Sequence, residues 1–293
     1  MNPRPLLGPD PPVENPDVGE HVAVAAPWLL QVALTQSFVH SVQTDLLLSD
    51  QQLQFERRSF TSYQRAVDGL LKTFPSISKV AEVSLVDRRR TCAVVGNSVN
   101  LKGSRYGHLI DAHDVVLRMN YAPTKGYEED VGTKTSHRLM YPESALDLND
   151  STHLVLLPFK ILDLEWLQQA FTTGFNGTSY KPVRATIRAN KSLVMVVNPG
   201  FIAYVNRAWL GMRRGYPSTG FLAVILALHM CDEVHVFGYG ADRNGNWSHY
   251  WGKVGENPNF KTGLHHGKHE YHMLRTMAVH QQLKFFRGCF QKA

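Results

Sequence analysis

The chain has 293 residues, 43% of them hydrophobic, which is enough to build one large α/β domain or two small ones around a substantial core. Its net charge of +6 is a mild basic excess, and the densest group of cations is the arginine triplet at residues 88–90. A basic surface attracts nucleic acid, acidic membranes or anionic substrates, but without a longer basic run we expect no nucleic-acid partner.

The amino-terminal part of the chain is expected to lie outside the main sheet and to carry no chemistry. Residues 1–20 are rich in proline, glycine and acidic residues, which predicts disorder. A helix is predicted within residues 28–48, and the apolar run at residues 22–34 is interrupted by a proline and is too short to span a membrane. It also lacks the flank and cleavage pattern of a signal peptide. The pattern of residues 61–73 predicts an amphipathic helix, which a following proline terminates.

From residue 92 onward, short apolar runs alternate with helical patterns. The predicted strands span residues 92–95, 115–119, 154–159, 193–197, 234–239 and 283–286. The predicted helices between them span residues 162–170, 201–210, 221–230 and 269–283. This alternation predicts an α/β fold, with a doubly wound, mainly parallel sheet and helices on both faces of a single Rossmann-type domain. The first strand is followed by Gly-Asn-Ser, so the GxGxxG dinucleotide fingerprint is absent.

Polar side chains follow the first two predicted strands. Asn97, Ser98 and Asn100 come after the first strand, and Asn120 comes directly after the second. Parallel sheets bind ligands just beyond the carboxyl ends of their strands, so these residues lie where a polar ligand would be held. Two ordinary strand-to-loop turns are the alternative interpretation.

The loop before the helix at residues 221–230 has a similar pair of interpretations. Ser218, Thr219 and Gly220 are small residues at a helix start, where exposed backbone N–H groups bind an anion or meet the hydroxyls of a ribose. The alternative is a plain helix that Ser218 or Thr219 caps.

Histidines are concentrated late in the chain, and they allow three interpretations. His249 and His265 suit proton transfer near neutral pH. Metal binding by His265, His269 and Glu270 is a second possibility, although Gly267 lies between the histidines and no HExxH motif is present. A surface cluster without a role is the third.

The three cysteines, Cys92, Cys231 and Cys289, are too few for a disulfide framework and lack the spacing of zinc ligands. Asn-x-Ser/Thr triplets mildly favour a protein of the secretory pathway. They begin at Asn149, Asn176, Asn190 and Asn246.

Four motifs, in order, resemble those of the animal sialyltransferases, glycosyltransferase family 29. Residues 92–144, with VGNSVNL, RMNYAPT, DVGTKT and MYPESA, are similar to the large sialylmotif, and residues 216–238, beginning YPSTG, are similar to the small one. His249-Tyr250 resembles the third motif, and His265 with Glu270 resembles the very small motif. The long segments are most similar to the subgroup that sialylates Galβ1,3GalNAc.

This resemblance implies a variant GT-A-like fold, with a stem-like or partly disordered segment at residues 1–55 and a catalytic domain at residues 56–293. It implies inverting transfer of sialic acid from CMP-sialic acid to the 3-hydroxyl of a terminal galactose on a glycoprotein or glycolipid acceptor. No cofactor or metal is expected, because CMP carries one phosphate and the sequence has no Asp-x-Asp pair. The family implies the Golgi lumen and a membrane anchor, which this chain does not display.

The resemblance also implies roles for individual residues. His265 would be the catalytic base, and His249 would support the departing phosphate. Cys92 and Cys231 would form a disulfide. The residues implied to bind the donor are Asn97, Asn100, Asn120, Tyr180, Tyr216, Ser218, Thr219, Gly220 and Gly240.

The chain departs from the family pattern near its proposed base. His266 stands where close relatives have an acidic residue, and HYWG replaces the commoner HYWE. A CMP-sugar-binding member with impaired catalysis is therefore the alternative hypothesis. It would keep the donor-binding residues and tolerate change around His265.

Overall fold

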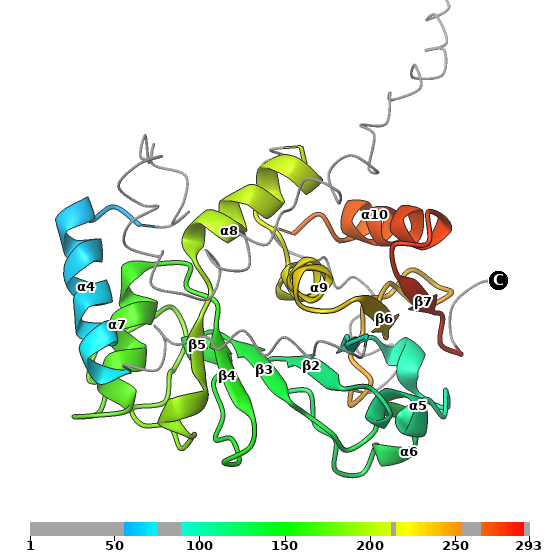
Figure 1. Ribbon diagram of the computed structural model, residues 1–293, viewed down its shortest axis with the longest axis horizontal. Helices are drawn as coiled ribbons and strands as arrows, with labels where there is room; N and C mark the ends of the chain where they lie inside the picture. Colours follow the sequence, from blue (N-terminus) through cyan, green and yellow to red (C-terminus); the bar gives the residue numbers. More distant parts are fainter. Residues whose placement is uncertain (1–55, 75–88, 212–214, 253–264, 290–293) are drawn as a thin grey trace, which may run out of the picture.

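The computed structural model describes residues 56–74, 89–211, 215–252 and 265–289, and the statements below refer to these ranges. The helix predicted within residues 28–48 and the disorder predicted for residues 1–20 lie outside them. At the centre is a seven-stranded sheet in the order β5-β4-β3-β2-β1-β6-β7, with every neighbouring pair parallel (Figure 1). The strands are β1 (Thr91–Val95), β2 (Val115–Met119), β3 (His137–Met140), β4 (His153–Leu156), β5 (Val194–Val196), β6 (Glu233–Phe237) and β7 (Lys284–Phe286).

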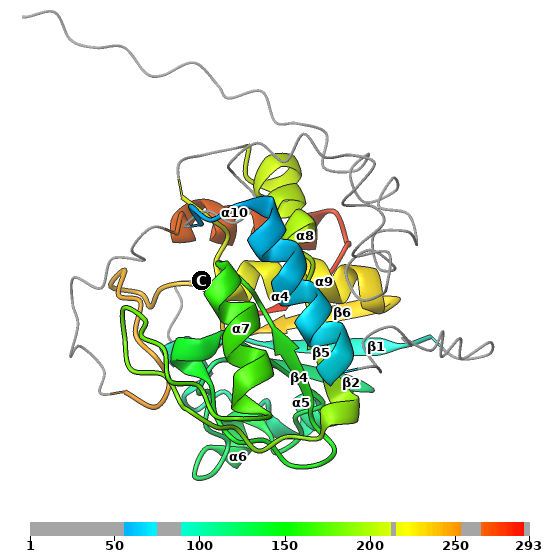
Figure 2. The ribbon, with the colours of Figure 1, turned by 90° about the vertical axis from the view of Figure 1, so that its left-hand side faces the viewer.

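Helices cover both faces of the sheet, as predicted. The longer ones are α4 (Phe60–Thr73), α7 (Ile161–Ala170), α9 (Thr219–Met230) and α10 (Gly267–Val279). The short ones are η2 (Val99–Leu101), α5 (Gly107–Asp111), α6 (Glu128–Val131), η3 (Pro142–Ser144), η4 (Lys191–Leu193), α8 (Pro199–Tyr204) and the π-helical turn η5 (Val205–Trp209). Helices α8, α9 and α10 lie on one face (Figure 1), and α4 packs on α7 on the other (Figure 2).

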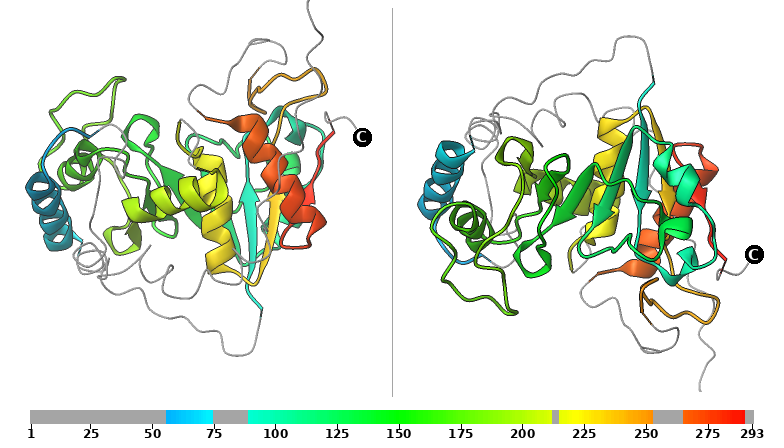
Figure 3. Two further views of the ribbon diagram at one scale, coloured as in Figure 1. Left: turned by 90° about the horizontal axis from the view of Figure 1, so that it is seen from above. Right: turned by 90° about the horizontal axis from the view of Figure 1, so that it is seen from below.

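Helix α9 is the central helix of the packing. Its sequence is apolar on all sides, and residues 221–227 are buried. The helix contacts β1, β2, β3 and β6, and the view from above shows it between α8 and α10 (Figure 3). A helix that is apolar all round needs partners on every side, and here the sheet and the two flanking helices supply them.

Strand β3 was not predicted from the sequence. It is four residues long and begins with His137 and Arg138, which do not indicate a buried strand. Both Arg138 and its neighbour Arg118 on β2 are buried, and both donate to backbone carbonyls: Arg118 to Val131 at 2.6 Å and Arg138 to Asn120 at 3.1 Å. Burial lowers the pKa of each guanidinium to about 10, which leaves both charged.

A disulfide joins Cys92 of β1 to Cys231 at the end of α9, with the two Cα atoms 5.9 Å apart. The pairing implied by the family resemblance is therefore confirmed. The remaining cysteine, Cys289, is exposed and unpaired. None of the described helices is long and apolar enough to cross a membrane.

The strand order fixes where a ligand would bind. Strands β1 to β5 run outward in one direction, and β6 and β7 lie on the other side of β1. The order therefore reverses between β1 and β6, and the crevice beyond the carboxyl ends of these two strands is the expected binding position of a doubly wound sheet.

Candidate active site

The turn after β1 and the loop after β6 meet at this reversal point. The backbone N–H of Gly96 donates to Phe237 at 2.7 Å, and that of Ser98 donates to Gly238 at 3.0 Å. A Cβ atom on Gly96 would lie 2.3 Å from the Gly238 carbonyl oxygen, so only glycine permits this approach. The sequence therefore brings two polar loops together at the carboxyl edge.

Asn100 holds the loop after β6 at this reversal point. Its side chain is fully buried, and Nδ2 donates to the carbonyls of Gly240 and Ala241, both at 3.1 Å. The Ser98 hydroxyl also donates to the Gly240 carbonyl, at 2.7 Å. Gly240 has a φ of 89°, which favours glycine. Asn100 and Gly240, both predicted to bind the donor, are thus engaged with each other.

Asn97 and Asn120 lie at the ends of β1 and β2. The Asn97 amide donates to the Met119 carbonyl at 3.3 Å, and its buried Oδ1 makes no hydrogen bond with any described residue. Asn120 adopts the left-handed φ of 56°, and its Oδ1 accepts a hydrogen bond from the Ser144 hydroxyl at 2.8 Å. Both amides therefore stand at the carboxyl edge, as predicted.

His249 lies directly against the turn after β1. It forms an antiparallel bridge with Ser98, and the following residue, Tyr250, donates from its backbone to the Asn97 carbonyl at 3.0 Å. The ring of His249 stacks on Trp251 with centroids 4.4 Å apart. Desolvation lowers the pKa of His249 below its ordinary value of 6.5. The third motif is therefore placed beside the large one.

His265 is held in one tautomer. Its Nδ1 donates to the Tyr216 backbone carbonyl at 3.0 Å, because a carbonyl oxygen can only accept. Nε2 is then the ring nitrogen that carries the lone pair. The Tyr216 ring meets the His265 ring edge-on at 4.5 Å and contacts Phe159 at 5.6 Å.

Glu270 joins the start of α10 to the start of α9. Its buried carboxylate accepts the Ser218 backbone N–H at 2.7 Å and the Ser218 hydroxyl at 2.6 Å. Ser218 caps α9 by accepting from the Phe221 N–H at 3.1 Å. Burial raises the pKa of Glu270, whereas the hydrogen bonds from Ser218 favour the ionised carboxylate and offset part of its desolvation.

This contact bears on the earlier interpretations of Ser218 and Glu270. Both Glu270 oxygens are engaged with Ser218, so Glu270 supports the cap of α9, and Ser218 is the capping residue, as predicted. No group of three or more His, Cys, Asp or Glu side chains in the described ranges could hold a metal ion.

Replacing Glu270 with alanine is expected to lower the free energy of unfolding by about 2 kcal/mol, because the Ser218 N–H and hydroxyl lose their charged acceptor. Glutamine can still accept from the N–H and donate to the hydroxyl, so Glu270→Gln should cost much less. Urea unfolding followed by circular dichroism measures both. Equal losses for the two variants would contradict the assigned hydrogen bonds.

Tyr239 connects the two parts of the site, and sequence analysis did not predict it. Its hydroxyl donates to the Gly220 carbonyl at 2.9 Å. A Cβ atom on Gly220 would lie 3.1 Å from the Tyr239 ring, and one on Gly96 would lie 2.8 Å from it. Tyr239 thus fills the space between the turn after β1 and the first turn of α9, where Thr219 is the first residue.

Tyr180 and Tyr141 flank the other side of the site. Tyr180 is 69% exposed and lies in the irregular segment between α7 and η4. The Tyr141 and Tyr180 hydroxyl groups interact, and each tyrosine lies close enough to Tyr216 for that ring to affect its pKa. Tyr141, which was not predicted, follows β3 directly, so the missed strand explains the missed residue.

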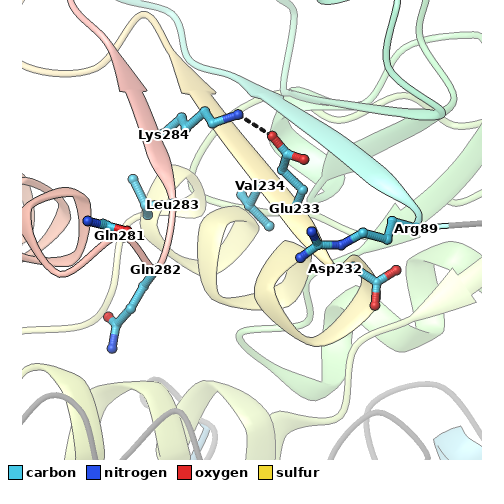
Figure 4. Close-up of a pocket in the computed structure, with 8 residues that line it drawn as sticks. All are labelled: Arg89, Asp232, Glu233, Val234, Gln281, Gln282, Leu283 and Lys284. Atoms are coloured by element: carbon cyan, nitrogen blue, oxygen red, sulfur yellow. Dashed lines mark hydrogen bonds and ion pairs between the residues drawn. The ribbon is translucent and has the colours of Figure 1, made fainter.

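A pocket of about 240 Å³ opens at the opposite edge of the sheet, at the amino ends of β6 and β7 (Figure 4). None of the predicted site residues lines it. Its lining residues are Arg89, Asp232, Glu233, Val234, Gln281, Gln282, Leu283 and Lys284.

Comparison with known proteins identifies the relatives of this chain. The family model for glycosyltransferase family 29 (sialyltransferase) matches residues 34–282. CMP-N-acetylneuraminate-beta-galactosamide-alpha-2,3-sialyltransferase 1 of Gallus gallus is 50% identical over 200 residues, covering 68% of this chain and 58% of that protein. The Homo sapiens protein of the same name is 50% identical over 200 residues, covering 68% and 59%. The chain thus spans a little under three fifths of these relatives' length.

Solved structures agree with the sequence relatives. The crystal structure of a mammalian sialyltransferase superposes with a TM-score of 0.71 at 42% identity, covering 81% of this chain and 83% of that chain. Its complex with Gal-beta-1-3GalNAc-ortho-nitrophenol gives a TM-score of 0.71 at 42% identity, covering 81% and 84%. The predicted GT-A-like, doubly wound fold is confirmed.

Proposed function

Because the chain belongs to glycosyltransferase family 29, the sialyltransferases, we propose that it is a β-galactoside α-2,3-sialyltransferase. It transfers sialic acid from CMP-sialic acid to the 3-hydroxyl of a terminal galactose, with Galβ1,3GalNAc as the acceptor. The single observation that carries this proposal is the His265 imidazole, whose Nδ1 donates to Tyr216 at 3.0 Å and leaves the lone pair on Nε2.

His265 acts as the general base. Nε2 takes the proton of the galactose 3-hydroxyl while that oxygen attacks the anomeric carbon of sialic acid. The bond from this carbon to the CMP phosphate breaks in the same displacement, which inverts the configuration. The Tyr216 carbonyl stabilises the imidazolium that forms, as an acceptor behind a catalytic histidine does.

The leaving phosphate is met by neutral donors. Burial raises the pKa of Tyr216, and burial and the Glu143 carboxylate raise that of Tyr180, so both phenols keep their protons at neutral pH. Hydroxyl donors aimed at a developing phosphate charge lower the barrier without a metal ion. His249 supports the same phosphate from the other side.

The nucleotide occupies the crevice between β1 and β6. Asn97 and Asn120 contact it directly, which fits the buried Asn97 Oδ1 that no described residue satisfies. Asn100 acts through the loop at Gly240, which it holds in place. Thr219 and Gly220, in the first turn of α9, contact the ribose and cytidine. Ser218 stabilises that turn, and its hydroxyl donates a hydrogen bond to Glu270.

One assay tests the proposal. The protein is incubated with CMP-sialic acid and a Galβ1,3GalNAc acceptor in the presence of EDTA, and sialylated product is measured. Transfer under these conditions supports the metal-independent enzyme, and loss of transfer on adding EDTA would contradict metal independence. Absence of transfer together with saturable CMP binding would instead favour the impaired member, which His266 beside the base motivates.

We place the protein in the Golgi lumen. The disulfide between Cys92 and Cys231 needs an oxidising compartment, and the secretory pathway supplies one. The proposed acceptor is a glycoprotein or a glycolipid with terminal galactose, and a panel of galactosides in the same assay distinguishes the two.

The lowered pKa of His249 predicts a pH dependence. If the imidazolium supports the leaving phosphate, kcat/KM falls as pH rises through the pKa of His249, with a midpoint below 6.5 in the free enzyme. His249→Asn should remove this alkaline decline and lower the maximal kcat/KM. Measuring kcat/KM between about pH 5 and pH 8 checks the prediction. An unchanged profile in the variant would exclude His249 as its source.

A further inference from the structure

Three charged side chains lie beside the tyrosines of the site, and the mechanism above uses them only through the effect of Glu143 on the pKa of Tyr180. The Lys160 ammonium is 3.0 Å from Glu143 Oε1 and 2.6 Å from Asp163 Oδ1. The Glu143 and Asp163 side chains are 2% and 1% exposed, and that of Lys160 is 20% exposed. We call these three residues the Lys160 cluster.

The cluster joins the carboxyl ends of two neighbouring strands. Glu143 lies in η3, just after Tyr141 and β3. Lys160 and Asp163 begin α7 after β4, and Asp163 Oδ2 accepts the backbone N–H groups of Phe159 at 2.8 Å and Lys160 at 3.2 Å. Tyr141 and Phe159, whose rings are 5.9 Å apart, therefore both adjoin the cluster.

The cluster also holds the segment that carries Tyr180. The Ser179 hydroxyl donates to Glu143 Oε1. The Lys160 ammonium lies 5.6 Å from the centroid of the Tyr180 ring, and Lys181 lies 5.9 Å from it. The described segment between α7 and η4 contains no helix or strand, so these side-chain contacts position a tyrosine that itself remains largely exposed.

Stability alone does not account for such a cluster. Two nearly buried carboxylates share one ammonium, and Glu143 Oε2 is buried without a hydrogen bond from any described residue. Buried ion pairs contribute little net stability, and apolar residues of similar volume often replace them without loss. They can instead fix one geometry, and the group whose geometry is fixed here is Tyr180.

We propose that Lys160 and Glu143 are positioning residues for the transfer reaction. Glu143 holds the backbone next to Tyr180 through Ser179, and the Lys160 ammonium holds the Tyr180 ring, so that its hydroxyl meets the departing phosphate. The inference rests on the proposed function, because Tyr180 matters here as a donor to that phosphate.

Replacing Lys160 with methionine keeps the stem and removes the charge. We expect kcat to fall about 10- to 100-fold, as for a donor displaced by about 1 Å, with little change in KM for CMP-sialic acid. Lys160→Arg can reach both carboxylates and stack on the ring, so it should restore most of kcat. A purely structural role would lower the melting temperature and leave kcat per folded molecule unchanged, and that result would overturn the proposal.

A double-mutant cycle shows whether Lys160 acts through Tyr180. Combining Lys160→Met with Tyr180→Phe should be no slower than Tyr180→Phe alone. If the two effects multiply, Lys160 acts elsewhere and the proposal is wrong. Lys284→Met is the matched control, because it breaks the Lys284–Glu233 pair at the opposite edge of the sheet (Figure 4) and should leave kcat unchanged.

Lys160→Met leaves two buried carboxylates without their cation and could fail to fold. Ser179→Ala keeps both ion pairs and cuts only the link from Glu143 to the Tyr180 segment. It is expected to lower kcat several-fold, and Ser179→Thr should restore it. Unchanged kcat in Ser179→Ala would overturn the Glu143 part of the proposal.

Measuring the affinity for CMP and for cytidine distinguishes failure of this inference from failure of the proposed function. Absence of transfer by the wild type would refute the proposed function. Lys160→Met and Ser179→Ala should still weaken binding of CMP about 10-fold and leave binding of cytidine unchanged, since only free CMP carries the full charge that develops on the departing phosphate and that Tyr180 meets. Equal effects on the two ligands, or none, would overturn the positioning role.

Discussion

Replacing His265 with alanine is expected to lower kcat by about 10²- to 10⁴-fold, the usual contribution of a positioned general base. The variant loses Nε2, the atom proposed to take the proton of the acceptor hydroxyl, and the Nδ1 donor that fixes the ring on Tyr216. Because the proposed nucleotide site lies at the ends of β1 and β6, KM for CMP-sialic acid should change little. Initial rates with saturating CMP-sialic acid and varied acceptor measure the effect.

His266 provides the matched control. It follows His265 directly and, like His265, lies close enough to Glu270 to affect the electrostatics of that carboxyl group, so each variant removes an imidazole from the same environment. His266→Ala should keep kcat within a few-fold of wild type, while CMP affinity stays unchanged in both variants. Full activity in His265→Ala would refute the base assignment, whatever the control shows.

The fold was largely predictable from hydrophobic patterning. Strands such as β1 and β6 are apolar runs bounded by polar residues, and a parallel sheet buried on both faces produces such runs. Strand β3 escaped prediction because Arg138 supplies a charge at a position buried beside Arg118. Its carbonyl partners lie in loops that only the tertiary fold brings close.

The positions of the candidate site residues in the fold were more predictable than their contacts. Motif order associated Asn97 with His249, and the structure has both at the turn after β1, although a motif does not show which way a side chain points. Asn100 and Ser218 are committed to Gly240 and Glu270, so they shape the loops. The position just after a strand end was a usable signal for Tyr239, which directly follows Gly238 at the end of β6.

The two halves of the site are held together by few connections. The proposed nucleotide site lies at the β1–β6 reversal, and the proposed base, His265, lies just before α10. Tyr239 joins them at one end of α9 through Gly220, and the disulfide joins β1 to the other end of the same helix. Because Tyr239 and the disulfide attach to opposite ends of helix α9, we expect a structural change at either end of this helix to affect both halves of the site.

Replacing both Cys92 and Cys231 with alanine is expected to lower the free energy of unfolding by about 5 kcal/mol. The bridge spans 139 residues of sequence, and closing so long a loop removes much entropy from the unfolded chain in the chain-entropy model. That loss is a large fraction of the total stability of a typical domain. Urea unfolding of the variant, and of the wild type with and without dithiothreitol, measures it.

The matched control is Cys289→Ser, which changes an exposed thiol outside the bridge and should leave stability unchanged. Because Cys92 is fully buried in the core beneath α9, alanine also removes a little packing, so the reduced wild type isolates the bridge itself. A loss below about 1 kcal/mol in both the variant and the reduced protein would contradict the entropic account. Loss of CMP binding before global unfolding would show that the bridge also keeps the crevice and α9 in register, since it anchors the strand that leads into Asn97.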